Sequence, residues 1–440
     1  MVEQRERATL PRRKLCASCG AQFGCAHGEP GCWCESILLR RETLAEIRAL
    51  ADDCLCPACL TGFADRERSD SLSDDSSNPA RSSGTTRWAK AIPHRAVRAR
   101  GVPPAWGVCA VLFVLGSLLF ALAIGPISIG AGSIAKSALS HLPLLHIHSS
   151  LSTVEEAIVW QIRAPRVVLA ALVGGMLAIS GSAYQGVFRN PLADPYLLGV
   201  AAGAGLGATL AIAYAPAGSR AGELLPLSAF AGAILGVTCA YLLGRSVGGV
   251  RNTGTLILAG VVVAAFMTAV QTFVQQQHSQ TLLSVYSWLL GGFGSADWHD
   301  VVLVAPYIAV SATVLLLHRR ILDVLSLGDE EAASLGLDVR RVRLLIVVAA
   351  TAGTAAAVAV SGLIGFVGII VPHTVRLLVS TSYRAVVPLS LLVGAGFLVL
   401  ADVVARTVMS PSELPIGVVT AFFGAPFFAV VLRNSRRLGA

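Results

Sequence analysis

The densest group of chemically reactive side chains in this sequence is a set of cysteines near its N-terminus. Eight of the ten cysteines fall within residues 16–59, in a pattern with two Cys-x-x-Cys pairs and a Cys-Trp-Cys triplet. Thiolates at such spacings are typical zinc ligands, and eight of them would satisfy two tetrahedral sites, a count that favours zinc over an iron–sulfur cluster. The predicted metal ligands are Cys16, Cys19, Cys25, Cys32, Cys34, Cys54, Cys56 and Cys59.

The sequence has no residues arranged for covalent catalysis. It contains no Gly-Lys-Ser/Thr triplet, and none of its lysines, Lys14, Lys90 and Lys136, follows a Gly-rich turn, so a phosphate-cradling loop of the Walker type is missing. Paired catalytic carboxylates and a Ser/His/Asp set on a soluble scaffold are missing as well. We therefore expect that this chain is not an enzyme.

A short polar segment at residues 325–336 separates two apolar runs. It predicts one short helix with Ser326 or Gly328 as its N-cap and Gly336 at its C-terminal exit. Three acids in the first turn would complement the positive end of the helix dipole: Asp329, Glu330 and Glu331. A merely solvated amphipathic loop is the alternative interpretation.

The elements that must position these residues are membrane helices. Hydrophobic residues make up 54% of the 440 residues and charged residues only 14%, and the mean hydropathy is +0.69. Such a composition is too apolar for a soluble protein. The net charge of +8 does not indicate nucleic-acid binding, because the basic residues alternate with runs long enough to cross a membrane.

Apolar runs of about 17–25 residues predict ten membrane spans in an all-α polytopic fold. They lie near residues 105–126, 166–187, 196–215, 225–245, 254–276, 300–318, 342–361, 363–380, 385–405 and 415–432. Three domains follow: a Cys-rich module at 1–62, a Ser-, Asp- and Arg-rich disordered linker at 63–103 and the membrane domain at 104–440.

Arginines orient these spans, because short cytoplasmic loops collect positive charge. The first residues hold no apolar segment typical of a cleaved signal, so we expect both termini in the cytoplasm. In that layout Arg163, Arg166 and Arg406 lie on the outer side, against the bias, and Asp402 lies one turn before Arg406. Snorkelling of these arginines to the membrane interface, together with a helical ion pair between Asp402 and Arg406, is one explanation.

Small residues and prolines give the membrane domain its expected close packing and sharp turns. Small residues let membrane helices approach each other, and proline cannot continue a helix. The residues that we assign to helix packing and turns are Gly174, Gly175, Gly181, Asn190, Pro191, Pro195, Gly365, Gly368 and Pro372.

From about residue 100 onward the chain resembles the iron-chelate and vitamin B12 importer permeases of the FecCD type. Three motifs in order carry the resemblance: Arg-Ala-Pro-Arg at 163–166 with the Asn-Pro and Asp-Pro turns at 190–195, Gly-Leu-Ile-Gly-Phe-Val-Gly-Ile-Ile-Val-Pro-His at 362–373, and Ala-Asp at 401–402 with Leu-Pro-Ile-Gly at 414–417 and Gly-Ala-Pro-Phe at 424–427. The Cys-Trp-Cys triplet resembles a small class of bacterial Cys-rich modules, whose role here stays open between a regulator, a metal sensor and a stabilising module.

The resemblance implies a permease subunit of an ABC importer in the bacterial inner membrane. Its cargo would be a bulky metal chelate, either a ferric siderophore or a cobalamin-type corrinoid, and haem also belongs to the range of the family. It implies a homodimer surrounded by membrane lipid, two ABC ATPase subunits, a periplasmic substrate-binding protein and no nucleic acid. The chain itself would need no cofactor for transport, because its partners use the ATP.

The resemblance also assigns roles to two groups of residues. Arg163, Arg166 and Arg406 would pair with acids on the two lobes of the binding protein. The segment that would fit a groove on the ATPase dimer comprises Gly328, Asp329, Glu330, Glu331, Ala332, Leu335 and Gly336. An ion-coupled secondary transporter and a metal-sensing membrane receptor are the alternatives, although the spans offer almost none of the buried charges that ion coupling needs.

Overall fold

The computed structural model describes residues 12–16, 22–25, 47, 59–62, 101–125, 129–140, 151–214, 221–248 and 253–438. Contacts divide the chain into two units, Met1–Ala96 and Val97–Ala440. In the first unit, strand β1 (Arg12–Leu15) pairs antiparallel with strand β2 (Gln22–Cys25). The linker expected at 63–103 lies outside the described residues as far as residue 100.

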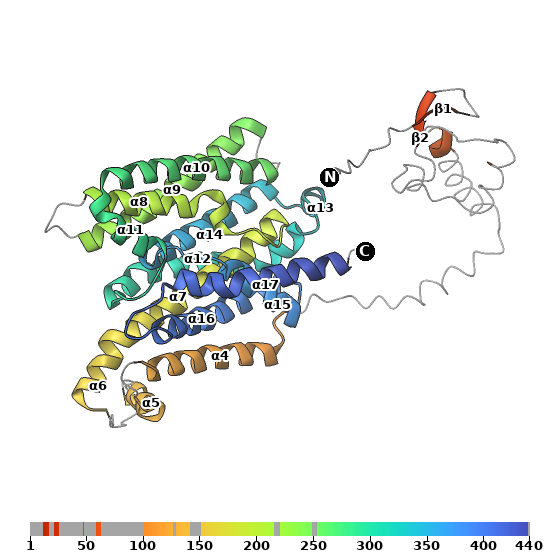
Figure 1. The fold of residues 1–440 in the computed structure, drawn as a ribbon. Helices are drawn as coiled ribbons and strands as arrows, with labels where there is room; N and C mark the ends of the chain where they lie inside the picture. Colours follow the sequence, from red (N-terminus) through yellow and green to blue (C-terminus); the bar gives the residue numbers. More distant parts are fainter. Residues whose placement is uncertain are drawn as a thin grey trace, which may run out of the picture. The chain divides into compact units, whose positions relative to one another are not determined.

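The second unit consists of helices (Figure 1). In chain order these are α4 (Pro104–Ala123), α5 (Ala131–Ser140), α6 (Thr153–Ala157), the π-helical turn η4 (Ile158–Arg163), α7 (Ala164–Phe188), the 3₁₀ turn η5 (Pro195–Leu198), α8 (Val200–Tyr214), α9 (Ala221–Gly248), α10 (Thr253–Gln277), the 3₁₀ turn η6 (Ser279–Thr281), α11 (Leu282–Leu289), α12 (Trp298–Leu325), α13 (Asp329–Ser334), α14 (Val339–Ser361), α15 (Val367–Leu378), α16 (Tyr383–Thr407) and α17 (Ile416–Leu438).

The predicted polytopic all-α fold is confirmed. Within the described part of the chain, seven helices are long and apolar enough to cross a membrane, and three shorter apolar helices join them: Val200–Tyr214, Val367–Leu378 and Ile416–Val431. Each of the ten predicted spans coincides with one of these helices. Among the described residues, the sequence missed short helices outside these spans, such as α5 and α11, and the α6 segment that precedes α7.

Helix α7 is the central element of the membrane unit. It packs against α12, α14, α15 and α16, and nearly all of its side chains are buried. Figure 1 shows α8, α9 and α10 grouped on one side of this core and α4 on the other, where α4 packs against α16. An apolar helix that is buried all round has no polar face, which explains why α7 shows no amphipathic pattern.

Glycines let α7 reach the backbones of its neighbours. A Cβ placed on Gly181 would overlap the backbone of Gly368 in α15, and one placed on Gly174 would overlap the carbonyl oxygen of Gly394 in α16. Since lipid tails are as apolar as the helices, this close van der Waals contact replaces the hydrophobic effect as the force that holds the bundle together. A Cβ on Gly365 would meet no heavy atom within 4 Å, so that glycine makes no such contact.

The helix that contains α7 begins earlier than the sequence predicts. Its α6 portion is capped by Ser152, whose side-chain oxygen accepts a hydrogen bond from the Glu155 N–H at 3.3 Å, while the Glu155 carboxylate accepts one from the Ser152 N–H at 2.8 Å. One π-helical turn then joins α6 to α7. Arg163 and Arg166 therefore lie inside one continuous helix, and the Ser-x-x-Glu capping box was the signal available in the sequence.

The turn after α7 is held by side chains that replace the missing helical hydrogen bonds. The Asp194 carboxylate accepts a hydrogen bond from the Tyr196 N–H at 2.9 Å, and the Tyr196 hydroxyl donates to the Ile364 carbonyl at 3.0 Å. Burial raises the pKa of Asp194 to about 6, and the hydrogen bond from Tyr196 opposes this increase. The turn thus fastens η5 to the segment before α15.

We expect Gly174→Leu to destabilise the bundle, because the new side chain must separate α7 from α16. Overpacking typically costs about 1–3 kcal/mol, which in a unit of this size corresponds to a decrease of about 1–4 °C in the unfolding temperature. Gly116→Leu in α4 is the matched control, because a Cβ there meets nothing within 4 Å. Thermal unfolding in detergent measures both variants, and equal unfolding temperatures would contradict the packing role of Gly174.

We also expect the stability of the fold to depend on pH through Asp194. Its folded pKa of about 6 lies above the ordinary value of 3.8, so the folded state holds the proton more tightly than the unfolded state. The free energy of unfolding should decrease as the pH rises from about 4 to about 6 and then level off. Asp194→Asn should remove this slope in unfolding measurements, and a slope that persists unchanged would show that another group is responsible.

Candidate functional site

The candidate site residues gather at opposite ends of the bundle. Helix α7 carries Arg163 and Arg166 near its first residue, and its last residue, Phe188, leads into the turn beside α13. We call the two regions the arginine end and the α13 end.

Arg163 and Arg406 bind the C-terminus of α4. The last carbonyl groups of a helix lack partners within the helix, and α4 has no basic residue in its own last turn. Arg163 Nη1 donates to the Leu122 carbonyl at 2.7 Å, and Arg406 Nη2 donates to the Ala121 carbonyl. With only 5% and 9% of their surfaces exposed, both arginines are buried.

Arg166 joins two carboxylates. Its Nε and Nη2 donate to Asp402 at 2.8–3.1 Å, and its Nη1 and Nη2 donate to Glu413 at 2.7 and 3.0 Å. Asp402 is 1% exposed, whereas Glu413 is 45% exposed. Breaking a buried pair by removing one partner costs about 3–5 kcal/mol, so the bond between Arg166 and Asp402 ties α7 firmly to α16.

Glu413 is a site residue that the sequence analysis did not identify. It lies between α16 and α17, directly before the Leu-Pro-Ile-Gly motif, and its position next to that motif was the available signal. Hydrogen bonds from Arg166 lower the pKa of Glu413. The carboxylate therefore stays charged at neutral pH and completes the network at the arginine end.

Helix α13 is short, anchored and partly apolar on its outside. Gly328 is its N-cap with φ of 143°, a conformation that favours glycine, and Gly336 follows its end with φ of 84°. Ala332, a residue of α13 itself, is fully buried. Leu327 and Leu335 are 64% and 66% exposed on either side of it, so the segment presents two leucines next to its acidic first turn.

Asp329 fixes this segment to the rest of the bundle. Its carboxylate accepts a hydrogen bond from Arg343 of α14 at 2.7 Å and lies 3.4 Å from an Arg189 nitrogen. Arg189 follows α7 in the left-handed conformation, with φ of 50°. Arg189 and Asp329 are both partly exposed, so their pair contributes little stability, whereas Arg343 is buried. Together the two pairs set the position of α13 relative to α7 and α14.

A second anchor at this end was also missed in the sequence. Asp323, near the end of α12, accepts hydrogen bonds from the Tyr383 N–H at 2.6 Å and the Ser382 hydroxyl at 2.8 Å. It therefore caps the N-terminus of α16 from another helix. Arg376 of α15 donates to Gln185 of α7, which extends the contacts across the α13 end.

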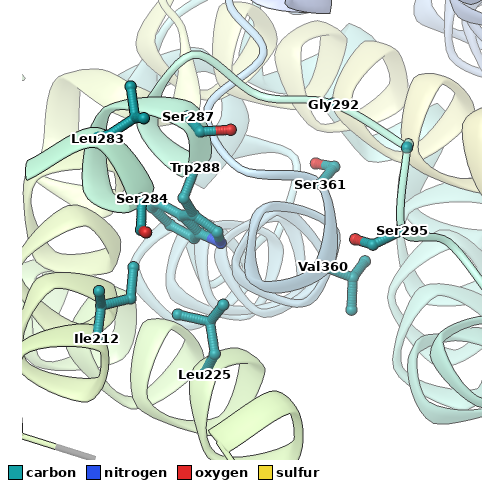
Figure 2. A pocket seen from close by; sticks show the side chains of 11 residues that line it. Ile212, Leu225, Leu283, Ser284, Ser287, Trp288, Gly292, Ser295, Val360 and Ser361 are labelled. Carbon is teal, nitrogen blue, oxygen red and sulfur yellow. The ribbon is translucent and has the colours of Figure 1, made fainter. Parts of the chain in front are cut away.

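A cavity of about 620 Å³ opens among α8, α9, α11 and α14. Figure 2 shows the hydroxyl groups of Ser287, Ser295 and Ser361 along one part of its wall, with Ile212 and Leu225 on another part. None of the residues that line it is charged: Ile212, Leu225, Leu283, Ser284, Ser287, Trp288, Gly292, Gly294, Ser295, Val360 and Ser361. The wall therefore combines apolar surface with neutral hydrogen-bonding groups.

Most of the predicted metal ligands lie outside the described residues. Only Cys16, Cys25 and Cys59 fall within them, and Cys16 is buried. The described parts of the chain contain no group of three or more His, Cys, Asp or Glu residues that could hold a metal ion. Zinc ligation by the eight thiols stays a prediction that rests on their type and spacing.

Two family models match separate parts of this chain. The model described as the FecCD transport family matches residues 112–434, and the model described as Cysteine-rich CWC matches residues 16–61. A solved structure of an inward-facing metal-chelate type ABC transporter is similar to the chain with a TM-score of 0.65 and 30% identity, over 76% of this chain and 100% of that one.

Curated relatives agree with these matches. The cobalamin import system permease BtuC of Halobacterium salinarum is 38% identical over 77% of this chain and 98% of its own length. The Fe(3+)-citrate import system permease YfmD of Bacillus subtilis is 36% identical over 74% of this chain and 96% of its own length. Together with the seven membrane-length helices and three shorter apolar helices of the described residues, these matches identify this chain as a member of the FecCD transport family.

Proposed function

We propose that this chain is the permease subunit of an ABC importer that takes up a bulky metal chelate, either a ferric siderophore or a cobalamin-type corrinoid. The names of its relatives support both cargo classes, because one imports cobalamin and another Fe(3+)-citrate. Partner subunits would bind and hydrolyse the ATP, and this chain would convert that work into alternating access.

The observation that carries the proposal is the form of α13. A coupling element must be anchored firmly to the permease and must still offer a surface to another protein. Asp329 supplies the anchor through Arg343 and Arg189, and the exposed Leu327 and Leu335 supply apolar surface. Exposed apolar side chains beside charged ones are typical of an interaction site.

Charge supports an orientation with the α13 end in the cytoplasm. Arg319 and Arg320 near the end of α12, and Arg340 and Arg341 at the start of α14, flank α13. Positive residues in short loops favour the cytoplasmic side. The arginine end would then face the periplasm of a bacterial inner-membrane importer, and both termini would be cytoplasmic.

The assembly that follows contains two copies of this chain, two ATPase subunits at the α13 end and a binding protein at the arginine end. In that arrangement the binding protein would deliver its cargo to a path between the copies. Arg163, Arg166 and Arg406 would form or support its docking surface, and the contacts of Arg163 and Arg406 with α4 give these two a supporting part.

The cavity beside α11 fits one wall of the conduction path. Its volume of about 620 Å³ falls in the range of small-molecule pockets, about 300–1,000 Å³. A bulky chelate presents both apolar and hydrogen-bonding surface, which the hydroxyl groups and Trp288 can accommodate. An ion-coupled secondary transporter would need charged groups in such a wall, and the absence of charge among these lining residues favours the importer.

The double variant Leu327→Ser/Leu335→Ser tests the coupling surface. We expect co-purification of the ATPase partner to fall at least tenfold, because a loss of about 1.4 kcal/mol corresponds to a factor of ten and two exposed leucines can contribute that much when buried. The unfolding temperature of the chain alone should stay within about 1 °C, because surface substitutions are nearly neutral.

Leu283→Ser is the matched control, since Leu283 is 83% exposed in α11, away from α13. It should leave the amount of bound ATPase unchanged. Equal ATPase binding by the double variant and the wild-type chain would contradict the assignment of α13 as the coupling element.

A further inference from the structure

The three arginines at the arginine end differ in the groups that they bind within the chain, and therefore in how readily they could bind a partner protein. Arg163 and Arg406 direct their guanidinium groups to the carbonyls that end α4, and both are buried. If either arginine moved outward, a carbonyl at the end of α4 would lose its hydrogen-bond partner. Arg166 is nearly as buried, with 11% of its side chain exposed, but it has no such contact with α4 among the described interactions and one of its two partners is exposed. It is therefore the arginine best placed to exchange partners.

The guanidinium of Arg166 binds one buried carboxylate, Asp402, and one exposed carboxylate, Glu413. Asp402 is 1% exposed and belongs to the rigid helix α16, so it stays in place. Glu413 is 45% exposed and lies outside the helices, in the connection between α16 and α17. The Arg166 side chain is only 11% exposed, but the Glu413 side of the pair is open to solvent, so a carboxylate of a partner can reach the same hydrogen-bonding positions.

Charge at this end favours such an exchange. Arg163, Arg166 and Arg406 carry three positive charges, and Asp402 and Glu413 carry two negative ones. If Glu413 leaves, the net charge of the cluster becomes more positive by one unit. The Arg166 Nη1 and Nη2 groups that it occupied are then free to bind another carboxylate. A planar guanidinium binds a carboxylate with two parallel hydrogen bonds, so an acidic side chain of a partner is the chemistry that fits.

The connection around Glu413 also touches the rim of the large cavity. The Glu413 carboxylate lies beside Gly294, where a Cβ would come within 3.4 Å of it. Three residues later, the Ile416 N–H donates to the Gly291 carbonyl at 3.1 Å. Gly292 and Gly294 line the cavity. A movement of Glu413 would therefore change the contacts of the cavity rim, through which the cargo would pass in the proposed function.

We propose that Glu413 occupies the Arg166 guanidinium until the binding protein docks. An acidic side chain of the binding protein then replaces Glu413 at Arg166. This inference rests on the proposed function, and it makes Arg166 the docking arginine whose partner within the chain must leave, while Arg163 and Arg406 also hold α4. Docking exchanges one carboxylate for another at Arg166, and the released Glu413 segment loosens its contacts with the cavity rim.

Two measurements test the exchange in the full chain reconstituted in nanodiscs. The first is the rate at which phenylglyoxal modifies Arg166, followed by peptide mass spectrometry. The second is the affinity for the purified, fluorescently labelled substrate-binding protein encoded nearest to this chain. Glu413→Gln should increase both the modification rate and the affinity by about fivefold, because it removes the charged competitor for the Arg166 guanidinium.

Glu156→Gln is the matched control for charge. It removes the same negative charge from α6, ten residues before Arg166 in the same continuous helix, and Glu156 has no part in the network around Arg166. If long-range attraction alone were responsible, both variants would raise the affinity equally and the inference would be overturned. The unfolding temperatures of both variants verify that the fold is intact.

The possible failures can be distinguished. If the wild-type chain binds the binding protein and Glu413→Gln binds it no more tightly than Glu156→Gln, the exchange is wrong and the importer function stands. If neither the wild-type chain nor Glu413→Gln binds it, docking itself fails, and the proposed function and the exchange fall together. An unchanged modification rate of Arg166 in Glu413→Gln would show that Glu413 does not cover this arginine.

Discussion

The close backbone contact of α7 with α15 and α16 is the constraint on which the other features of the membrane unit depend. Gly181 meets the backbone of Gly368, and Gly174 meets that of Gly394, so three helices are held at distances that no larger side chain would allow. Because α7 reaches from the arginine end to the turn beside α13, this packing fixes the frame in which both candidate surfaces are placed. Displacement of either surface must therefore involve α7 or the segments attached to its ends.

Polar contacts complete this frame where the helices end. Arg163 and Arg406 satisfy the last carbonyls of α4, and Asp402 ties Arg166 to α16. At the other end, Asp323 caps α16 and Asp329 anchors α13. The buried contacts hold the helices together, while Glu413 and the leucines beside α13 stay exposed. This division between fixed interior and accessible ends is what a protein needs when two different partners act on one bundle.

The sequence predicted the spans well because an apolar run long enough to cross a bilayer is a strong signal. It also offered Ser326 or Gly328 as the N-cap of the short helix and Gly336 as its C-terminal exit. The structure has Gly328 as the N-cap, and both glycines adopt a conformation that favours glycine. The sequence could not predict the partners of Arg163 and Arg406, because contacts with α4 join residues about forty and nearly three hundred positions apart. The roles of Glu413 and Asp323 were missed for the same reason. The partner of each acid, a distant arginine for Glu413 and the N-terminus of α16 for Asp323, becomes visible only in the folded chain.

The source of energy for uptake tests the central claim most directly. Proteoliposomes that contain this chain and its ATPase partner, oriented with the α13 end inside, should accumulate a ferric chelate or cyanocobalamin delivered by the loaded binding protein only when ATP is enclosed. Accumulation should be insensitive to ionophores that collapse proton and sodium gradients. Uptake that proceeds without ATP and stops when those gradients collapse would contradict the account and indicate an ion-coupled transporter instead.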